Sequence, residues 1–359
     1  MPMLVDRIQQ SRAERHHFRR AVTRGQPYKP IYVKIKIAWV CNLRCAMCNH
    51  WREASEPALD LAFYRDLVAE LAALGCQKIH LTGGEPMLWP DLEELIRDIC
   101  DRGIRPTMTS NGTRIDAERA RALVAAGLRK INISLDSPEP ALHDQARGVP
   151  GAWEKAVAAC RHLRPWLRPG GLQLNTVISA LNYASLGRLP DLAIALGVDR
   201  LNLIPLDEHT PDIQRLSPAQ IQDYNRRIGP VIARKALSAG LLSKVAQAYP
   251  FGGDRAAHEQ SSAGHYAHGY YEDHPCFAPW THCLIDHVGR VSVCCMLPNQ
   301  PVIGDLRTAS FREIWTGDAF AALRRTQNLP LFDTCRHCDM FIAANQQLSA
   351  LVAGNRRPD

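Results

Sequence analysis

The sequence predicts an α/β protein in which a partial (β/α)6 TIM-like barrel precedes a small C-terminal domain. Two observations carry this prediction. Six strand-like segments alternate with helix-like segments, and this repeat is typical of a parallel sheet built from βα units. Glycine-containing turns follow several of the helix-like segments, where glycine commonly ends a helix before the next strand. Six units are fewer than the eight of a closed TIM barrel, so we expect an incomplete barrel.

The elements of the predicted barrel follow one another at regular intervals. The strand-like segments carry the two-residue alternation or the short apolar runs of strands, and they cover residues 32–39, 78–82, 105–110, 131–136, 172–178 and 200–205. The helix-like segments between them cover about residues 59–74, 91–102, 116–127, 151–166 and 184–197. Together these elements predict a barrel domain at residues 32–248.

The segments that flank the barrel have their own character. Residues 1–31 are rich in arginine and predict a basic leader helix, which we interpret as a solvated surface helix rather than a docking site for an acidic partner. Residues 249–275 are rich in Gly, His and Tyr, lack a helix or strand period and exceed ordinary connections. We expect a functional loop over the barrel mouth there, with an ordered linker as the alternative. The C-terminal domain is predicted at residues 276–345 and a tail at 346–359.

Length and composition exclude several classes of protein. The chain has 359 residues, 46% of them hydrophobic, with a formal net charge of +7, which suits a main domain plus a smaller one. No apolar run approaches the ~18 residues that a membrane helix needs, and no leader with a cleavage site opens the chain. We therefore expect a cytoplasmic protein without a membrane partner. No nucleic-acid-binding signature is present, so we expect no such partner, and nothing indicates an oligomeric state.

A group of three cysteines directly follows the first predicted strand. The sequence Cys41-Asn-Leu-Arg-Cys45-Ala-Met-Cys48 has the spacing C-x3-C-x2-C, which can hold three irons of a 4Fe-4S cube and leave the fourth iron open to another molecule. The carboxyl end of a parallel strand is where the catalytic loops of a barrel lie. The alternative is a zinc site, to which His50 could add a fourth ligand, or a set of structural thiols.

Small and polar residues follow the later strands. Gly83-Gly84-Glu85-Pro86 follows the second strand, and two residues without a Cβ would let backbone approach a ligand closely, unless the segment is an ordinary turn. Polar side chains gather at the other strand ends, although helix capping is the commoner role for any one of them; they are Ser110, Asn111, Ser134, Asp136 and Asn175. Asp207 and Glu208 follow the sixth strand and could act on a substrate as base or hydrogen-bond acceptor, with helix capping as the alternative.

A second group of cysteines lies in the C-terminal domain. Cys276, Cys294, Cys335 and Cys338 could hold a second cluster with every iron ligated, and a zinc ribbon is the structural alternative. Cys295 is adjacent to Cys294 and could replace it, and Cys283 is a weaker candidate. The remaining cysteines lie apart from these groups, so we interpret them as buried core residues; they are Cys76, Cys100 and Cys160.

The two cysteine motifs and the Gly-Gly-Glu-Pro segment resemble those of the radical S-adenosylmethionine (radical SAM) superfamily. The resemblance implies that the open iron binds SAM, and that an electron from the cluster cleaves SAM to a 5′-deoxyadenosyl radical, which abstracts hydrogen from a substrate. It assigns the amino group of SAM to Glu85 in the loop that begins at Gly83 and Gly84, and the carboxylate of SAM to Arg147, whose guanidinium fork suits it. The resemblance also implies that the ribose and the carboxylate of SAM are contacted by Ser110, Asn111, Ser134, Asp136 and Asn175.

The chain departs from the family at one position of the first motif. Many members have an aromatic residue before the third cysteine, whereas this chain has Met47, so adenine contacts there would involve a thioether. The C-terminal spacing, C-x12-G-x4-C from Cys276 to Cys294 followed by C-x2-C, resembles the SPASM extension. The chain has no cysteine after Cys338, which resembles the shortened form called a twitch domain and implies one auxiliary 4Fe-4S cluster. This spacing favours Cys294 over Cys295.

The expected reaction follows from the auxiliary cluster. A fully ligated cluster could accept an electron from the substrate, which predicts a two-electron oxidation. The resemblance further implies an electron donor of flavodoxin or ferredoxin type. We favour a small-molecule substrate, because relatives that act on peptides usually carry two auxiliary clusters and this chain is expected to carry one. In addition, the roughly thirty residues before the first strand are too few for a peptide-recognition fold. The alternatives are a peptide maturase or a redox-neutral epimerase or lyase. A more remote alternative is a non-catalytic iron-sulfur or zinc protein.

Overall fold

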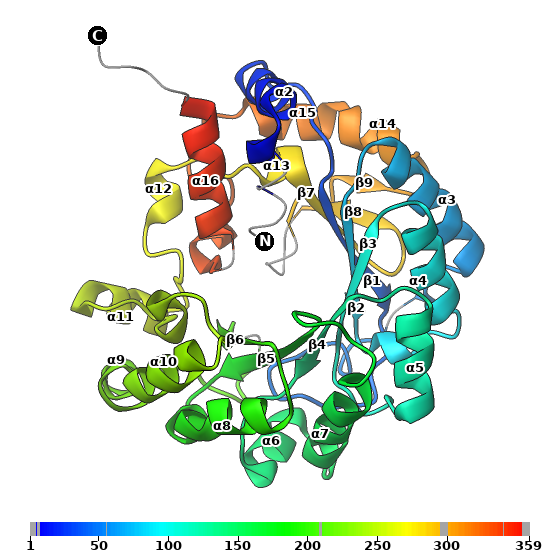
Figure 1. The fold of residues 1–359 in the computed structure, drawn as a ribbon. Coiled ribbons are helices and arrows are strands. Elements are labelled where there is room, and N and C mark those ends of the chain that lie inside the picture. The colour runs from blue at the N-terminus through cyan, green and yellow to red at the C-terminus, as the bar shows by residue number, and fades with distance from the viewer. Residues whose placement is uncertain are drawn as a thin grey trace.

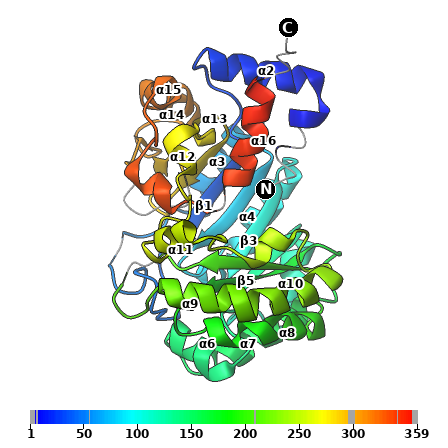
Figure 2. The same cartoon turned by 90° about the vertical axis from the view of Figure 1, so that its left-hand side faces the viewer.

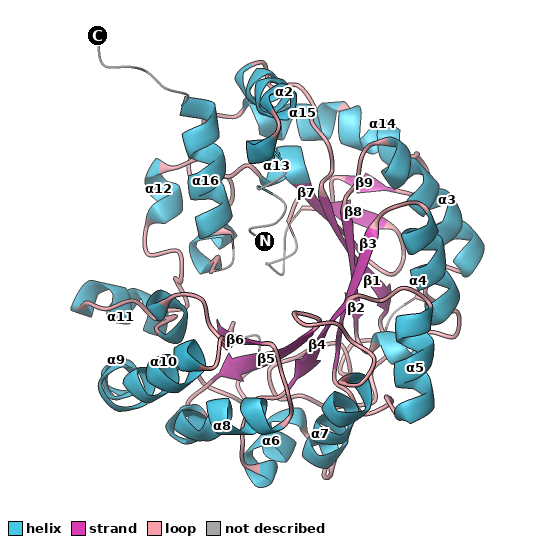
Figure 3. Cartoon of the chain, in the orientation of Figure 1, coloured by secondary structure: helices cyan, strands magenta, loops and turns pink. Residues whose placement is uncertain are grey.

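The barrel sheet is confirmed in the computed structural model, which describes residues 5, 8–54, 56–207, 210–294, 301–339 and 341–353. Six strands pair in parallel with their sequence neighbours and form one curved sheet with helices on its outer side (Figures 1 and 3). These strands are β1 Tyr32–Ala38, β2 Lys78–Gly83, β3 Arg105–Ser110, β4 Lys130–Ser134, β5 Leu172–Ile178 and β6 Arg200–Pro205. All six lie within a few residues of their predicted positions.

The outer helices follow the strands as predicted. Aspartates cap two of them, because the Asp60 side chain accepts a hydrogen bond from the backbone N–H of Phe63 and Asp116 accepts one from Arg119. The predicted helices are α3 Leu61–Ala73, α4 Leu92–Asp101, α5 Ala117–Ala125, α7 Ala152–Leu163 and α8 Leu189–Ala195. Short turns precede two of these helices, namely η1 Pro86–Leu88 and η2 Tyr183–Arg188.

One barrel helix was missed in the sequence. Helix α6, Pro140–Arg147, lies between β4 and α7. Its eight residues begin with proline at the first position and end at Gly148, whose φ of +69° is the left-handed conformation that glycine favours. The helix is too short to show a convincing 3.6-residue period. It nevertheless carries Arg147 and anchors the cysteine loop.

The sheet extends beyond the six predicted strands. Strand β7, His282–Ile285, pairs in parallel with β1, so that Tyr32 lies opposite His282 and Ile35 opposite Ile285. Strands β8, Arg290–Ser292, and β9, Gly304–Asp305, continue the sheet in antiparallel pairs, giving the order β6-β5-β4-β3-β2-β1-β7-β8-β9. The C-terminal region therefore shares the barrel sheet. Cys283 is buried on β7 in the barrel core, which argues against it as a cluster ligand.

Helices after β6 complete the chain. The segment at 249–275, expected as a loop, contains α11 Arg255–Ser262 and α12 Tyr270–Asp273, which are too short to show a period. Asp254 caps α11 by accepting a hydrogen bond from the backbone N–H of Ala257. The other elements after β6 are α9 Pro218–Asp223, η3 Tyr224–Ile228, α10 Gly229–Ser238, η4 Val245–Ala248, α13 Ala278–Thr281, α14 Phe311–Thr316, α15 Asp318–Arg325, η5 Asp333–His337 and α16 Ile342–Ala353.

The basic leader contains helix α2, Arg12–Thr23, which lies against α16 (Figure 2). The prediction of a solvated helix holds for one face only. Phe18 is fully buried in a second hydrophobic core, which it shares with Phe277, Trp280, Cys335 and Cys338. The buried face of α2 therefore packs into the same core as two cysteines of the C-terminal motif. No helix among the described residues is long and apolar enough to cross a bilayer.

Candidate cluster and cofactor sites

Most of the predicted site residues line one cavity of about 860 Å³ at the carboxyl ends of the barrel strands. The cavity size falls within the range of ligand pockets, roughly 300–1,000 Å³. The predicted residues that line it are Cys41, Cys45, Met47, Cys48, Gly83, Gly84, Glu85, Ser110, Asn111, Ser134, Arg147 and Asp207. Asp136 and Asn175 are not among the lining residues, and Glu208 lies outside the described residues.

The cysteine loop is held in place by helix α6. The backbone N–H of Arg44 donates to the carbonyl of Arg147 at 3.1 Å, and that of Ala46 donates to Ala146 at 2.9 Å. A Cβ added at Gly148 would lie 2.2 Å from the carbonyl oxygen of Arg44, so the close approach of these backbones requires glycine there. The position of the three thiols is therefore set by an element that the sequence did not predict.

The two glycines of the Gly-Gly-Glu-Pro segment approach the chain itself. The backbone N–H of Gly84 donates to Ala38 at 2.8 Å, and that of Glu85 donates to Val40 at 2.9 Å. A Cβ added at Gly84 would lie 2.2 Å from the carbonyl oxygens of Trp39 and Val40. The expectation that these glycines make room for a ligand is therefore incomplete. They bring the loop after β2 against the residues that lead into the cysteine loop.

Glu85 joins this loop to the end of β3. Its buried carboxylate accepts hydrogen bonds from the Ser110 hydroxyl at 2.7 Å, the Asn111 backbone at 2.7 Å and the Met87 backbone at 3.1 Å. Burial raises the pKa of Glu85, and these hydrogen bonds oppose the rise. A carboxylate has about four acceptor positions, so three donors leave capacity for a further one. Acceptance of the SAM amino group at Glu85 stays a prediction.

Asn111 extends the same network to the cysteine loop. Its side-chain amide donates to the Asn42 amide oxygen at 3.0 Å and lies 4.0 Å from the sulfur of Cys41. Ser110 and Asn111 therefore support the loop that holds the thiols, in addition to lining the cavity. Asn175 lies on β5 and accepts hydrogen bonds from the Gln173 and Asn202 side chains, at 3.1 Å and 3.2 Å, away from the cavity wall.

Arg147 and Asp136 form a buried ion pair beside Cys45. The guanidinium nitrogens Nη2 and Nε of Arg147 lie 2.8 Å and 2.7 Å from the two carboxylate oxygens of Asp136. Nη1 of Arg147 lies 3.8 Å from the sulfur of Cys45. Asp136 also accepts a hydrogen bond from the backbone N–H of Val177 at 3.0 Å, and its side chain is 1% exposed. Its contact with the cofactor stays a prediction, and in this structure Asp136 orients Arg147.

His143 of α6 continues this chain of contacts and gives a pH-dependent prediction. Burial lowers the pKa of His143 to about 4, and the neutral ring accepts a hydrogen bond from the backbone N–H of Asp136 at 3.1 Å. Below its ordinary pKa of 6.5, the unfolded chain binds a proton at this residue that the folded chain does not. The unfolding free energy should therefore fall as pH drops from about 6.5 to about 4, by up to about 1.4 kcal/mol per pH unit.

The His143→Asn variant isolates this contribution. An asparagine carbonyl can accept the same hydrogen bond but does not titrate, so the variant should lose less stability on acidification than the wild-type protein. Denaturant unfolding of both proteins between about pH 4 and pH 7 measures the difference. Equal slopes for the two proteins would show that His143 is not held neutral.

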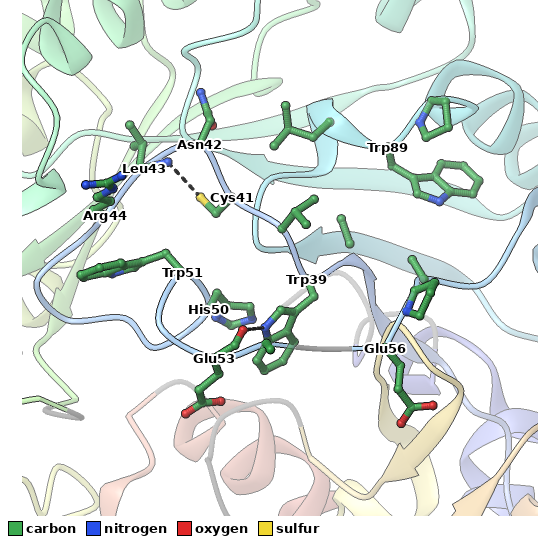
Figure 4. A pocket seen from close by; sticks show the side chains of 17 residues that line it. Trp39, Cys41, Asn42, Leu43, Arg44, His50, Trp51, Glu53, Glu56 and Trp89 are labelled. Atoms are coloured by element: carbon green, nitrogen blue, oxygen red, sulfur yellow. Dashed lines mark hydrogen bonds between the residues drawn. The ribbon is translucent and has the colours of Figure 1, made fainter.

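An outer pocket of about 740 Å³ adjoins the cysteine loop (Figure 4). Trp39, Trp51 and Trp89 line it, together with Cys41, which also lines the inner cavity. Nδ1 of His50 lies 3.2 Å from the sulfur of Cys48, and burial lowers the pKa of His50 to about 4. The two pockets adjoin at the cysteine loop, because both are lined by Trp39, Cys41, Leu43, His50, Trp51 and Glu53.

The cysteine loop offers the donors of an iron-sulfur cluster. Burial raises the pKa of Cys41 to about 11. Burial also raises the pKa of Cys45, and the nearby positive charge of Arg147 opposes this rise. A coordinating metal deprotonates such thiols. Within the described ranges, no three or more His, Cys, Asp and Glu residues surround a single ion position. A four-iron cube takes one thiolate on each iron, so its ligands need not converge on one point.

The four predicted C-terminal ligands line a third pocket, which is apolar and separate from the two pockets at the cysteine loop. Cys276, Cys294, Cys335 and Cys338 meet there among Tyr271, Ala278, Val293, Leu331, Phe332 and Phe341. Burial raises the pKa of Cys276 and of Cys338 to about 12, so these thiols also require a metal to become thiolates. Cys295 lies outside the described residues. The ligand assignment stays a prediction, but the structure brings all four thiols to one place.

Two polar residues that the sequence did not single out complete this pocket. The hydroxyl of Tyr271 lies 3.6 Å from the sulfur of Cys338, and the side-chain amide of Asn345 donates to the sulfur of Cys276 at 3.7 Å. Asn345 also donates to the Tyr271 hydroxyl at 2.7 Å and accepts from the backbone of Phe277 at 2.9 Å. Hydrogen bonds to sulfur tune iron-sulfur clusters, so these donors fit a cluster here.

Two family models match the two regions just described. The Radical SAM superfamily matches residues 35–166, and an iron-sulfur cluster-binding domain, SPASM, matches residues 276–339. A haem synthase of Methanosarcina barkeri that depends on S-adenosylmethionine is 30% identical over 82% of this chain and 85% of its own length. A PqqA peptide cyclase of Ruegeria pomeroyi is 31% identical over 86% of this chain and 80% of its own length.

Solved structures show the same fold. The crystal structure of SuiB of Streptococcus suis bound to S-adenosylmethionine matches with a TM-score of 0.66 and 18% identity. The match covers 92% of this chain and 77% of SuiB. The structure of anSMEcpe with S-adenosylmethionine and the Cp18Cys peptide matches with a TM-score of 0.59 and 15% identity, covering 87% of this chain and 86% of that one.

Proposed function

Because the chain belongs to the radical SAM superfamily and carries a C-terminal SPASM domain, we propose that it is a maturase that oxidises a peptide substrate. The radical SAM domain implies a 4Fe-4S cluster and SAM, and the SPASM domain implies an auxiliary iron-sulfur cluster. When bound, the first cluster and SAM supply a 5′-deoxyadenosyl radical. The observation that carries the peptide proposal is the similarity to PqqA peptide cyclases, which spans both domains of this chain.

The small-molecule interpretation of the sequence has less support than its peptide alternative. That interpretation depended on one auxiliary cluster and on the short segment before the first strand. The peptide cyclases of Ruegeria pomeroyi and Methylocella silvestris each match 86% of this chain, and each match covers 80% of the relative. Similarity over most of each peptide cyclase therefore favours the peptide alternative.

The geometry supports an oxidation that uses both thiol sites. Asp207 lines the cavity, and its carboxylate lies 3.7 Å from Nδ1 of His337, the residue directly before Cys338. The cavity wall is thus in direct contact with the C-terminal cysteine motif. Asp207 is placed to accept a hydrogen bond or a proton from the substrate, while Arg147 faces the same cavity with a fixed guanidinium. These roles of Asp207 and Arg147 are part of the proposal.

The proposed reaction balances as a loss of two hydrogen atoms. One hydrogen atom leaves a substrate C–H bond and forms 5′-deoxyadenosine. The resulting carbon radical would form a bond within the peptide and release one proton and one electron. A cluster held by Cys276, Cys294, Cys335 and Cys338 would accept that electron. A redox-neutral epimerase or lyase would leave the substrate at its original oxidation state.

The test uses peptides from the source organism, because the substrate is unidentified. The cluster-loaded protein, SAM and reductant are incubated with the small-peptide fraction of cells grown in D2O. We expect deuterium in 5′-deoxyadenosine and a peptide that has lost two hydrogen atoms, both measured by mass spectrometry. Digestion of the fraction with protease beforehand should remove both signals. Signals that survive digestion would exclude a peptide substrate.

A haem precursor is the second candidate substrate. The haem synthase of Methanosarcina barkeri matches this chain about as well as the peptide cyclases do. Carboxylates of a porphyrin could face Lys36 and Arg147, which both line the cavity. If the cluster-loaded protein converts an iron porphyrin in the presence of SAM while peptides do not react, this candidate replaces the peptide proposal.

A further inference from the structure

The third cysteine of the first motif is in contact with His50, which follows it closely in the chain. The sequence left this histidine open as a fourth ligand of a zinc site. In the structure, Nδ1 of His50 lies 3.2 Å from the sulfur of Cys48. Nε2 of the same ring is buried and has no hydrogen-bond partner among the described residues. The ring therefore contacts the motif through Nδ1 and a cysteine sulfur.

The orientation of the His50 ring is fixed by Trp39. The ring centroids of the two residues lie 4.4 Å apart, and their planes are inclined by 35° (Figure 4). The indole N–H of Trp39 donates to the backbone carbonyl of Glu53 at 2.8 Å, which fixes the indole in turn. His287, from the turn between β7 and β8, also packs against the indole, with centroids 5.0 Å apart. The barrel and the C-terminal region thus hold the imidazole at Cys48 together.

A different donor lies beside each sulfur of the motif. These donors are the backbone N–H of Leu43, 3.4 Å from Cys41, Nη1 of Arg147, 3.8 Å from Cys45, and Nδ1 of His50, 3.2 Å from Cys48. The histidine makes the shortest of the three contacts. Arg147 also pairs with Asp136, so its substitution would disturb more than one contact. The effect of a side-chain donor on a motif sulfur is therefore best isolated at His50.

The state of the sulfur decides which ring nitrogen carries the hydrogen. A thiolate bound to iron can only accept hydrogen bonds, because the metal has removed the thiol proton. The contact with Cys48 then requires the ring hydrogen of His50 on Nδ1. A hydrogen on the buried Nε2 would instead lack an acceptor among the described residues. Hydrogen bonds to the sulfurs help set the reduction potential of an iron-sulfur cluster, and a donor favours the reduced form because that form carries one more negative charge.

We propose that His50 is a positioning residue for the cluster of the cysteine loop: its Nδ1–H donates to the Cys48 thiolate and raises the reduction potential of that cluster, and Trp39 holds the ring in the donating orientation. His50 is then a donor to a ligand and not a ligand itself. Its effect is to make the entry of the one electron that cleaves SAM more favourable. This role goes beyond the proposed function, because it concerns the cluster and is independent of the substrate.

The reduction potential of the cluster in the whole, cluster-loaded protein tests this role. It is measured by anaerobic redox titration with EPR detection, and the signal of the cysteine loop is the one that Cys41→Ala lacks. His50→Phe keeps an aromatic ring against Trp39 but removes the donor. We expect its equilibrium constant for reduction to fall roughly three- to tenfold, so that the potential becomes more negative. His50→Asn keeps an N–H two bonds from Cβ, as Nδ1 is, and should restore most of the wild-type potential.

His162→Phe is the matched control, because it makes the same exchange on α7 at a residue that lines neither thiol pocket. The control should keep the wild-type potential, and all three variants should keep about eight irons per chain, as two four-iron cubes require. An unchanged potential in His50→Phe, or an equal shift in His50→Asn, would overturn the proposal. Loss of iron from His50→Phe would also overturn it, because His50 would then hold the metal or the loop. None of these measurements uses a peptide, so their failure would leave the proposed function standing.

Discussion

Replacing Cys41, Cys45 or Cys48 with alanine should abolish SAM cleavage, whereas replacing Cys335 or Cys338 should abolish product formation but leave part of the cleavage. The first three thiols line the cavity that would hold SAM, and losing one of them should disable the open-iron site. The other two thiols lie in the separate apolar pocket. Chromatography of 5′-deoxyadenosine after reduction with dithionite measures the cleavage.

A matched control tests the loss of a buried thiol alone. Cys160 is fully buried in the barrel core and lies in neither thiol pocket, so Cys160→Ala should keep cleavage and iron content. Equal loss of cleavage in the two groups of variants, with the proteins still folded, would show that the two sites do not have separate roles.

The Gly84→Ala variant should lose the cluster of the cysteine loop although it changes no ligand. The added Cβ would meet the carbonyl oxygens of Trp39 and Val40 at 2.2 Å, and backbone atoms cannot rotate away as a side chain could. The segment that leads into Cys41 must therefore shift. We expect iron to fall from about eight toward about four atoms per chain, because one of two four-iron cubes is lost, and SAM cleavage to fall with it.

Gly253→Ala is the control for this substitution. A Cβ at Gly253 would have no atom within 4 Å, and its φ is not in the left-handed region, so the variant should keep full iron content and cleavage. Full iron content in Gly84→Ala would show that the contact between the two loops does not position the cysteine loop.

The sequence predicted the barrel well because each strand and its following helix carry a local pattern. It did not predict that β7 joins β1, since pairing between strands about 250 residues apart leaves no local signal. Helix α6 was missed because eight residues show too little periodicity. The two C-terminal strands after β7 were missed for the same reason, because they are too short to show a pattern.

The candidate site also contains residues that a local motif predicts and residues that only the folded structure brings together. The cysteines and Glu85 could be singled out in the sequence because their spacing is local and specific, and the structure places them around two pockets. Asp136 was expected at the cofactor but is buried against Arg147, because sequence position gives the strand end and not the direction of the side chain. Tyr271 and Asn345 reach the auxiliary thiols from segments without a motif. Only the packing of α12 and α16 brings them there.

The central claim is that this chain cleaves SAM reductively at the cysteine loop. The most direct measurement is the anaerobic incubation of the cluster-loaded protein with SAM and dithionite, followed by quantification of 5′-deoxyadenosine and methionine. We predict that the two products form in equal amounts and that Cys41→Ala forms neither. A wild-type protein that carries its full iron and sulfide and still yields no 5′-deoxyadenosine would contradict the claim.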